Sequence, residues 1–409
     1  MSAKKLSFSG FSAFALLMCI TFGAIKMRTY ASEGRFWAEE GTFFYSNMLN
    51  LPIWERPFFL FNGHLEFITN IIVTLATLVD IEYAPLLTTH LAYAAQLIPI
   101  YIIIKNREAL GLSEWKVISL IIISVGIPQA SEVWANTTNL HFHFALTAGL
   151  IASLPPAEGL GRHFQRLMLL ASGLSGIPAN FILPVFISNA TREKTRERWI
   201  QMSIILTTAT LQVGLLITNS VEQTGRNYSF NPLIHWLASL SQSVTTPLLG
   251  LEIGHHISQI LRSAYEFNIN GLLFAAALSI LPAYLILAVI YQTNRTHKSL
   301  LACAAISLIM CITTSLGSKT SLISSFYGGR YFYASNIFLT ICLLGSIKKY
   351  HHAAIALACI TTLASIKNIP HFLDGPSWQD SLTKAKTLNA TQVEIWPQGW
   401  TMRLPDGTK

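Results

Sequence analysis

Long apolar runs with few charges are the feature that most limits what this chain can fold into. Only 12% of its 409 residues are charged and 52% are hydrophobic, whereas about 25% of residues are charged in soluble globular proteins. A helix of about 20 apolar residues crosses the hydrocarbon core of a bilayer. We therefore predict an all-α integral membrane protein with about eleven transmembrane helices, near residues 8–25, 83–104, 117–128, 139–154, 167–176, 181–190, 199–218, 271–291, 300–317, 335–347 and 353–366.

The distribution of basic residues predicts the orientation of these helices. Lys and Arg are concentrated in short segments between the apolar runs, and short basic segments are usually retained in the cytoplasm. Lys4 and Lys5 precede the first apolar run. No small-residue cleavage site follows that run, so it is predicted to be retained, with the N-terminus in the cytoplasm. The apolar segment 64–80 is short and is assigned to the outer interface, because a crossing there would place the basic segment 105–116 outside. The net charge of +8 is thus attributed to topology, and no nucleic-acid partner is expected.

The remaining segments define the domain organisation. Residues 1–366 are predicted to form one transmembrane domain with two long outer segments, 26–82 and 219–270, and residues 367–409 a tail too polar to cross. We expect this tail to dock against the outer segments, since its tryptophans would otherwise be exposed. The run 172–184 carries Gly and Pro between two half-length apolar stretches, which is typical of a broken helix pair that lines a cavity.

The first candidate site is FWAEEGTFFY, residues 36–45, which puts two adjacent carboxylates, Glu39 and Glu40, in an aromatic run. Adjacent carboxylates in a partly apolar site repel each other, so at least one is expected to have a raised pKa and to accept a proton near neutral pH. A general base that activates a hydroxyl group needs this property. The alternative is a pair of solvated loop residues. Arg56 and His64, in the same outer segment, are lesser candidates.

The second candidate site is ASEVWANTTNLHFHF, residues 130–144. Its polar residues recur at helical spacing, so a helix would put them on one face, where they could bind sugar hydroxyls. These residues are Glu132, Asn136, Asn139 and His143. His141 would point elsewhere on such a helix, and the HxH spacing is a poor match to helical metal ligands. The alternative is a polar cap that satisfies helix ends.

The third candidate site is SSFYGGRYFYAS, residues 324–335, where a single Arg330 is flanked by two glycines and by aromatic residues that include Tyr327 and Tyr331. An arginine offers a rigid fork of donors for a phosphate, and glycines let the backbone approach it closely. The segment therefore suits a lipid phosphate headgroup. The alternative is an aromatic belt with a snorkelling arginine.

The order of these motifs resembles that of the GT-C superfamily of membrane glycosyltransferases. Glu39–Glu40 stands where such enzymes carry an acidic pair, usually with Asp first, and residues 132–143 stand where they carry a second polar motif. NGHLEFITNIIVTLA, residues 62–76, resembles their juxtamembrane helix, and GGRYFY, residues 328–333, resembles a lipid-phosphate arginine motif. With the closing WPQGW, the pattern is also loosely similar to phage-type O-antigen glucosyltransferases.

This resemblance implies an inverting transferase of the bacterial inner membrane, with its C-terminus in the periplasm. It would pass a sugar from a polyprenyl-phosphate donor to a glycan or lipid acceptor on the outer face, without a metal or other cofactor. Glu39 or Glu40 would act as base and Arg330 would bind the phosphate. Two alternatives stay open: an O-antigen polymerase or ligase, which typically relies on outer-loop arginines, and a lipid or solute transporter or flippase, which the broken segment 172–184 favours.

Overall fold

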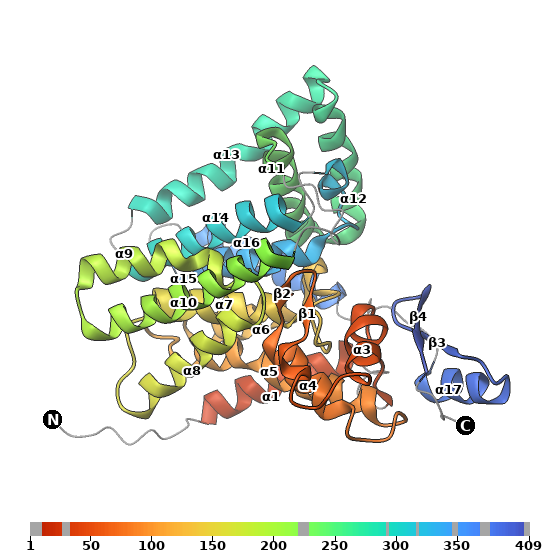
Figure 1. The fold of residues 1–409 in the computed structure, drawn as a ribbon. Helices are drawn as coiled ribbons and strands as arrows, with labels where there is room; N and C mark the ends of the chain where they lie inside the picture. Colours follow the sequence, from red (N-terminus) through yellow and green to blue (C-terminus); the bar gives the residue numbers. More distant parts are fainter. Residues whose placement is uncertain are drawn as a thin grey trace.

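The protein is almost entirely helical (Figure 1). The structure is a computed structural model that describes residues 10–26, 33–219, 229–291, 294–315, 319–345, 351–368 and 377–404. Strands in these residues form two small hairpins, so the prediction of a helical fold is confirmed. Lys4 and Lys5, on which the predicted position of the N-terminus depends, lie outside the described residues.

Four helices in the described part are long and apolar enough to cross a membrane. A helix rises about 1.5 Å per residue, so about 20 residues span the apolar core of a bilayer. These four indicate a membrane protein and are α5 (Ala84–Lys105), α10 (Arg196–Asn219), α13 (Ile269–Tyr291) and α14 (Arg295–Ser315).

Eleven separate crossings are not shown by the described helices. The other apolar runs form helices that are shorter or that fall short in apolarity. These helices are α1 (Gly10–Lys26), α4 (Phe67–Ala76), α6 (Glu114–Gly126), α7 (Leu140–Ser153), α8 (Leu160–Leu174), α9 (Leu183–Glu193), α15 (Tyr333–Gly345) and α16 (His351–Asn368).

Helix α7 lies at the centre of the molecule, packed between α5, α8, α14 and α15 (Figure 1). Its sequence, LHFHFALTAGLIAS, is apolar on nearly every side, as expected of a helix that neighbours surround. Every residue of α7 is buried except His141. Gly149 lets α15 come close, because a Cβ there would lie 2.2 Å from the ring of Phe338.

The segment predicted as the second outer loop, 219–270, is largely helical, which corrects its description as a loop. Helix α11 (Pro232–Ser239) starts after Asn231, whose side chain accepts hydrogen bonds from the amides of Leu233 and Ile234, and Pro232 fits the first helical position. The chain continues through the π-helical turn Leu240–Thr245 into α12 (Thr246–Tyr265), which is kinked at Gly250, where φ is +80°. Residues 220–228 lie outside the described part.

The first outer segment ends in a hairpin that leads into a short helix. Strands β1 (Leu60–Phe61) and β2 (His64–Leu65) pair antiparallel and run directly into α4 (Phe67–Ala76). Ten helical residues cover about 15 Å, half of the bilayer core, so α4 alone does not cross a membrane.

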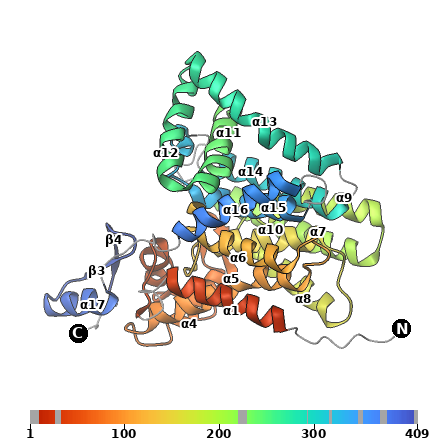
Figure 2. The same ribbon diagram turned by 180° about the vertical axis from the view of Figure 1, so that it is seen from behind.

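The C-terminal lobe, residues 377–404, docks on the outer segment that carries Glu39 and Glu40, as expected. It consists of α17 (Trp378–Thr387) and the antiparallel strands β3 (Gln392–Ile395) and β4 (Trp400–Arg403). Figures 1 and 2 show it beside α3 (Ser46–Met48), at the edge of the molecule. Trp396 is 2% exposed, and its backbone pairs with residues 36–38.

Candidate active site

A cavity of about 240 Å³ collects most of the polar motifs in one place. One wall is apolar and comes from the break between α8 and α9 and from α10, so the broken pair lines a cavity as predicted. The other wall is polar and aromatic. The lining residues that carry hydrogen-bonding or charged groups are Glu39, His64, Glu66, Thr138, Asn139, His141, Thr314, Arg330 and Tyr331.

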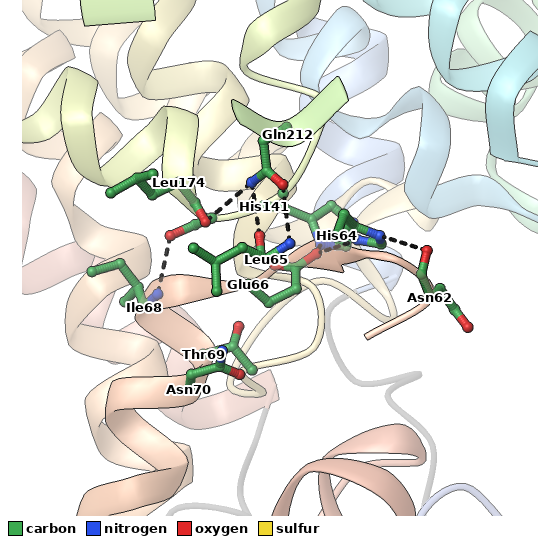
Figure 3. A network of polar contacts seen from close by, with 12 residues as sticks. Asn62, His64, Leu65, Glu66, Ile68, Thr69, Asn70, His141, Leu174 and Gln212 are labelled. Atoms are coloured by element: carbon green, nitrogen blue, oxygen red, sulfur yellow. Dashed lines mark hydrogen bonds and ion pairs between the residues drawn. The ribbon is translucent and has the colours of Figure 1, made fainter. Parts of the chain in front are cut away.

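At the base of this cavity a buried carboxylate, Glu66, holds two histidines (Figure 3). Its Oε1 lies 3.0 Å from Nε2 of His64 and 3.3 Å from Nδ1 of His141. Burial alone would raise the pKa of Glu66, but the charges and hydrogen bonds of His141 and His64 outweigh it and lower the pKa to about 2. Glu66 is therefore a carboxylate at neutral pH.

Helix α10 fixes the strand that carries this carboxylate. The side chain of Gln212 accepts a hydrogen bond from the Leu65 amide (3.0 Å) and donates one to the Leu65 carbonyl (2.9 Å), as Figure 3 shows. The amide of Gly176 donates to the same carbonyl, also at 2.9 Å. Gly176 has φ +97°, and a Cβ there would lie 2.9 Å from both Oε1 of Glu66 and Cβ of His141. The glycine thus makes room for the Glu66–His141 contact.

Glu39 and Glu40 lie in different surroundings. The Trp37 amide donates to Oε2 of Glu40 (3.0 Å), and the Thr137 amide and hydroxyl donate to its Oε1 (3.2 and 2.6 Å). Glu40 is fully buried outside the cavity lining, and burial raises its pKa to about 7 in spite of these hydrogen bonds. The raised pKa was expected, but its cause is burial and not repulsion by Glu39.

Glu39 lines the cavity. Its Oε2 is buried and receives no hydrogen bond from any residue in the described part of the chain. The preceding residue, Ala38, has φ +41°, and its amide donates to the Trp396 carbonyl of the C-terminal lobe. The left-handed backbone of Ala38 turns the chain directly before the two acids, so Glu39 and Glu40 lie on different sides.

The second motif does not form the predicted helical stripe. Residues 131–139 form turns, Ala135 has φ +59°, and α7 begins only at Leu140, so the expected spacing on one helix face was wrong. Asn136 accepts from the amide and side chain of Asn139 (3.0 and 2.9 Å) and closes the turn. This supports the alternative of a polar cap for Asn136.

The other residues of the second motif separate. Asn139 also lines the cavity, and the carboxylate of Glu132 pairs with Arg330 at 3.1 Å. His143 is buried away from the cavity, with its ring 4.7 Å from that of Trp134 and 5.0 Å from that of Tyr333.

The third motif brings a cation to the cavity. Residues Gly329–Phe332 form a 3-10 turn after Gly328, whose φ is +67°. A Cβ on Gly329 would lie 3.3 Å from Cα of Gln129, so the glycine lets this turn approach the 128–130 segment. Arg330 and Tyr331 line the cavity, and the guanidinium stands 5.3 Å from the Tyr331 ring centroid.

Arg56 and Tyr327 also stay outside the cavity. Arg56 donates to the Leu51 carbonyl (2.9 Å) and to the Thr77 hydroxyl, so it ties the first outer segment to the end of α4. Tyr327 is 42% exposed, and its carbonyl accepts from Gln242.

Glu66 and His141 are the polar residues of the site that sequence reasoning left without a role. A signal was present in NGHLEF, because residues two apart in a strand share a face, so His64 and Glu66 can act together. Among the described residues no group of three or more His, Cys, Asp or Glu could hold a metal ion. Comparison with protein-family models, with curated proteins and with solved structures gives no match to this chain.

Proposed function

We propose that the chain is an integral membrane glycosyltransferase that moves a sugar, with inversion, from a polyprenyl-phosphate donor to a glycan or lipid acceptor. The observation that carries this proposal is that Glu39 and Arg330 line one cavity. Sugar transfer from a phosphate needs a group that takes the proton of the acceptor hydroxyl and a cation that stabilises the departing phosphate.

Glu39, and not Glu40, suits the role of base by its position, because the acid with the raised pKa, Glu40, does not line the cavity. Both oxygens of Glu40 already accept hydrogen bonds from Trp37 or Thr137, and the side chain is sealed from the cavity. Glu39 lines the cavity, and its Oε2 accepts no hydrogen bond from any described residue. It would take the proton of the acceptor hydroxyl as the new bond to the sugar carbon forms.

Arg330 suits the role of phosphate ligand. Its NH1 nitrogen pairs with Glu132 at 3.1 Å, which fixes the guanidinium at the cavity. A planar fork of donors matches phosphate oxygens, and its charge opposes the charge that develops as the sugar–oxygen bond breaks.

The apolar wall supports a lipid-linked donor. Val213 and Leu216 of α10 belong to this wall, Thr314 of α14 lines the same cavity, and both helices are long and apolar enough to cross a membrane. A polyprenyl chain lying along these helices would bring its phosphate to the polar end of the cavity. The proposal places the protein in a bacterial inner membrane with this cavity on the periplasmic side.

The test compares charge-removing variants of the two acids. A deletion strain would be complemented with the wild type, Glu39→Gln, Glu40→Gln or Glu55→Gln, and its surface glycans and lipids measured by mass spectrometry for loss of one sugar. In parallel, membranes would receive labelled polyprenyl-monophosphate sugars. Glu39→Gln should lower transfer about 10²–10⁴-fold, the usual contribution of a general base.

Glu55→Gln is the matched control, because Glu55 is an exposed carboxylate of the same outer segment. Full transfer by Glu39→Gln at wild-type protein level would contradict the assignment of the base. Consumption of a diphosphate-linked oligosaccharide, or movement of solute without a covalent product, would contradict the proposed reaction itself.

A further inference from the structure

We propose that His141 is the second proton-transfer group of this cavity, oriented by Glu66, and that it gives a proton to the departing phosphate. The inference rests on the proposed function for its chemistry. Its geometry stands independently, because it depends only on how Glu66, His64 and His141 are placed.

The position of Glu66 decides which nitrogen of His141 is free. Nδ1 of His141 lies 3.3 Å from Oε1 of Glu66, and an ionised carboxylate can only accept a hydrogen bond. This ion-pair contact favours a proton on Nδ1, so Nε2, on the other side of the ring, is the nitrogen that can exchange one. A carboxylate that fixes the tautomer of an imidazole in this way is a general device for proton transfer.

His64 faces acceptors on both sides and differs from His141 in this respect. Its Nε2 lies 3.0 Å from Oε1 of Glu66, and its Nδ1 lies 3.3 Å from the carbonyl of Asn62 (Figure 3). Both contacts are hydrogen bonds only if both ring nitrogens carry protons. Both ring nitrogens of His64 are thus engaged by acceptors, whereas the acceptor contact of His141 is at Nδ1.

The surroundings of His141 fit this role. It is the one residue of α7 that is not buried, and it lines the same cavity as Glu39 and Arg330. Gly176 keeps the space beside it open, since any Cβ there would lie 2.9 Å from Cβ of His141. The charged and titratable groups near its ring are Glu66 and His64 from the hairpin, Glu39 and Arg330 from the cavity lining, and His143 from α7.

These groups account for every proton that moves during the transfer. The acceptor oxygen forms a bond to the sugar carbon and loses its proton to Glu39. The bond from that carbon to the phosphate oxygen breaks, and its electron pair stays on the phosphate, which takes the Nε2 proton of His141. Exchange of one proton with water then removes it from Glu39 and returns one to His141, so no other reactant is needed.

The test follows the histidines themselves and does not depend on turnover. Diethyl pyrocarbonate modifies unprotonated imidazole nitrogens, and mass spectrometry of the purified full-length protein in nanodiscs gives a rate for each histidine across a pH series. His141 should be modified readily at high pH and slowly at low pH, while His64 should react at least tenfold more slowly than His141. Inorganic phosphate should slow the modification of His141 at least threefold.

Glu66→Gln tests the orienting carboxylate. Removal of an opposite charge in direct contact should move the pH midpoint of His141 modification down. It should also make His64 more reactive, because one of its two acceptor contacts is weakened. The exposed His256 serves as reference inside each sample, and Glu55→Gln is the control variant; neither should show a change in midpoint.

Three results would overturn the inference: equal rates for His64 and His141 in the wild type, no slowing by phosphate, or the same His141 midpoint in Glu66→Gln. The first two need no variant, so they hold even if Glu66→Gln fails to fold. A midpoint shift without any sugar transfer would keep the oriented imidazole and remove the glycosyltransferase. Transfer that continues with an unshifted midpoint would remove the role of His141 alone.

Discussion

Glu39 and Glu40 are adjacent in the chain, yet only Glu40 is sealed from the cavity. The difference arises from Thr137, which donates twice to Glu40 and joins the acidic segment to the turn before α7. Glu40 thus links two segments almost a hundred residues apart, whereas Glu39 is left beside Arg330.

The raised pKa of Glu40 predicts a pH-dependent stability. Burial moves this pKa from 4.5 to about 7, so between these values the folded protein holds a proton that the unfolded chain has released. The free energy of unfolding should therefore fall as pH rises from 4.5 to 7, by about 3 kcal/mol in total. Glu66 adds no slope there, because its lowered pKa costs stability only as pH falls towards 2.

Thermal unfolding at several pH values measures this effect. Wild type should lose stability towards neutral pH, and Glu40→Gln, which stays uncharged, should lack that slope. Glu55→Gln should follow the wild type, since Glu55 is exposed. An unchanged slope in Glu40→Gln would show that another group is responsible.

At the scale of elements, the hairpin, the α8–α9 break and the start of α7 meet at one glycine. Gly176→Ala should destabilise the protein for two reasons: a left-handed φ of +97°, which costs a non-glycine residue about 1–3 kcal/mol, and a Cβ too close to Glu66 and His141, which adds a similar amount. Gly159→Ala is the matched control, because Gly159 has φ +54° with no atom near its Cβ position.

Differential scanning fluorimetry measures the stability of the two variants, and the transfer assay measures their activity. Gly159→Ala should lose only about 1–3 kcal/mol, from backbone strain, and keep its transfer, whereas Gly176→Ala should lose more stability and most of the transfer. Equal effects in the two variants would mean that backbone strain alone matters and that the close packing does not.

The C-terminal lobe predicts a second effect of packing. Trp396 is buried and its backbone pairs with residues 36–38, so it holds the segment that carries Glu39. Trp396→Ala should cost about 3–5 kcal/mol and lower transfer. Trp54→Ala, which removes a tryptophan that is 71% exposed, should do neither. Wild-type transfer by Trp396→Ala would show that the lobe does not position the acid.

For the whole molecule, the apolar runs predicted the helical class. A helix buried in lipid or in protein must be apolar along its whole length, so the composition alone indicates it. The basic-residue pattern kept the segment of α4 out of the crossings, but hydropathy counted the two halves of the α8–α9 pair as separate crossings, because it does not measure whether a helix is long enough. Docking of the tail was predictable from Trp396, because a side chain of that size is costly to expose to water.

The site was predictable in part. Glu39, His64 and Arg330 were found from charge in apolar surroundings, and they do line one cavity. The helical stripe failed because the turn at Ala135 has a left-handed backbone that spacing does not reveal. The Glu66–His141 contact joins segments far apart in sequence, so only the packing around Gly176 could show it.

The proposed orientation predicts which residues a membrane-impermeant maleimide reaches from outside. Trp54→Cys, in the acidic outer segment, should be labelled in intact spheroplasts, and Glu158→Cys, in the 155–166 segment, only after permeabilisation. Both positions are exposed. Among the native cysteines Cys359 alone is exposed, so the variants are built on Cys359→Ser. The reverse pattern would place the cavity on the cytoplasmic side.

The two hydrogen bonds between Gln212 and Leu65 have a mechanical consequence. The side-chain amide of Gln212 makes the hydrogen bonds to β2 that a third strand would make. The hairpin is therefore coupled to α10 and has no free edge on that side. Helix α10 is long enough to adapt its tilt to bilayer thickness. A thinner or thicker membrane would thereby shift Leu65 and the carboxylate that follows it, so that lipid chain length could tune the reaction.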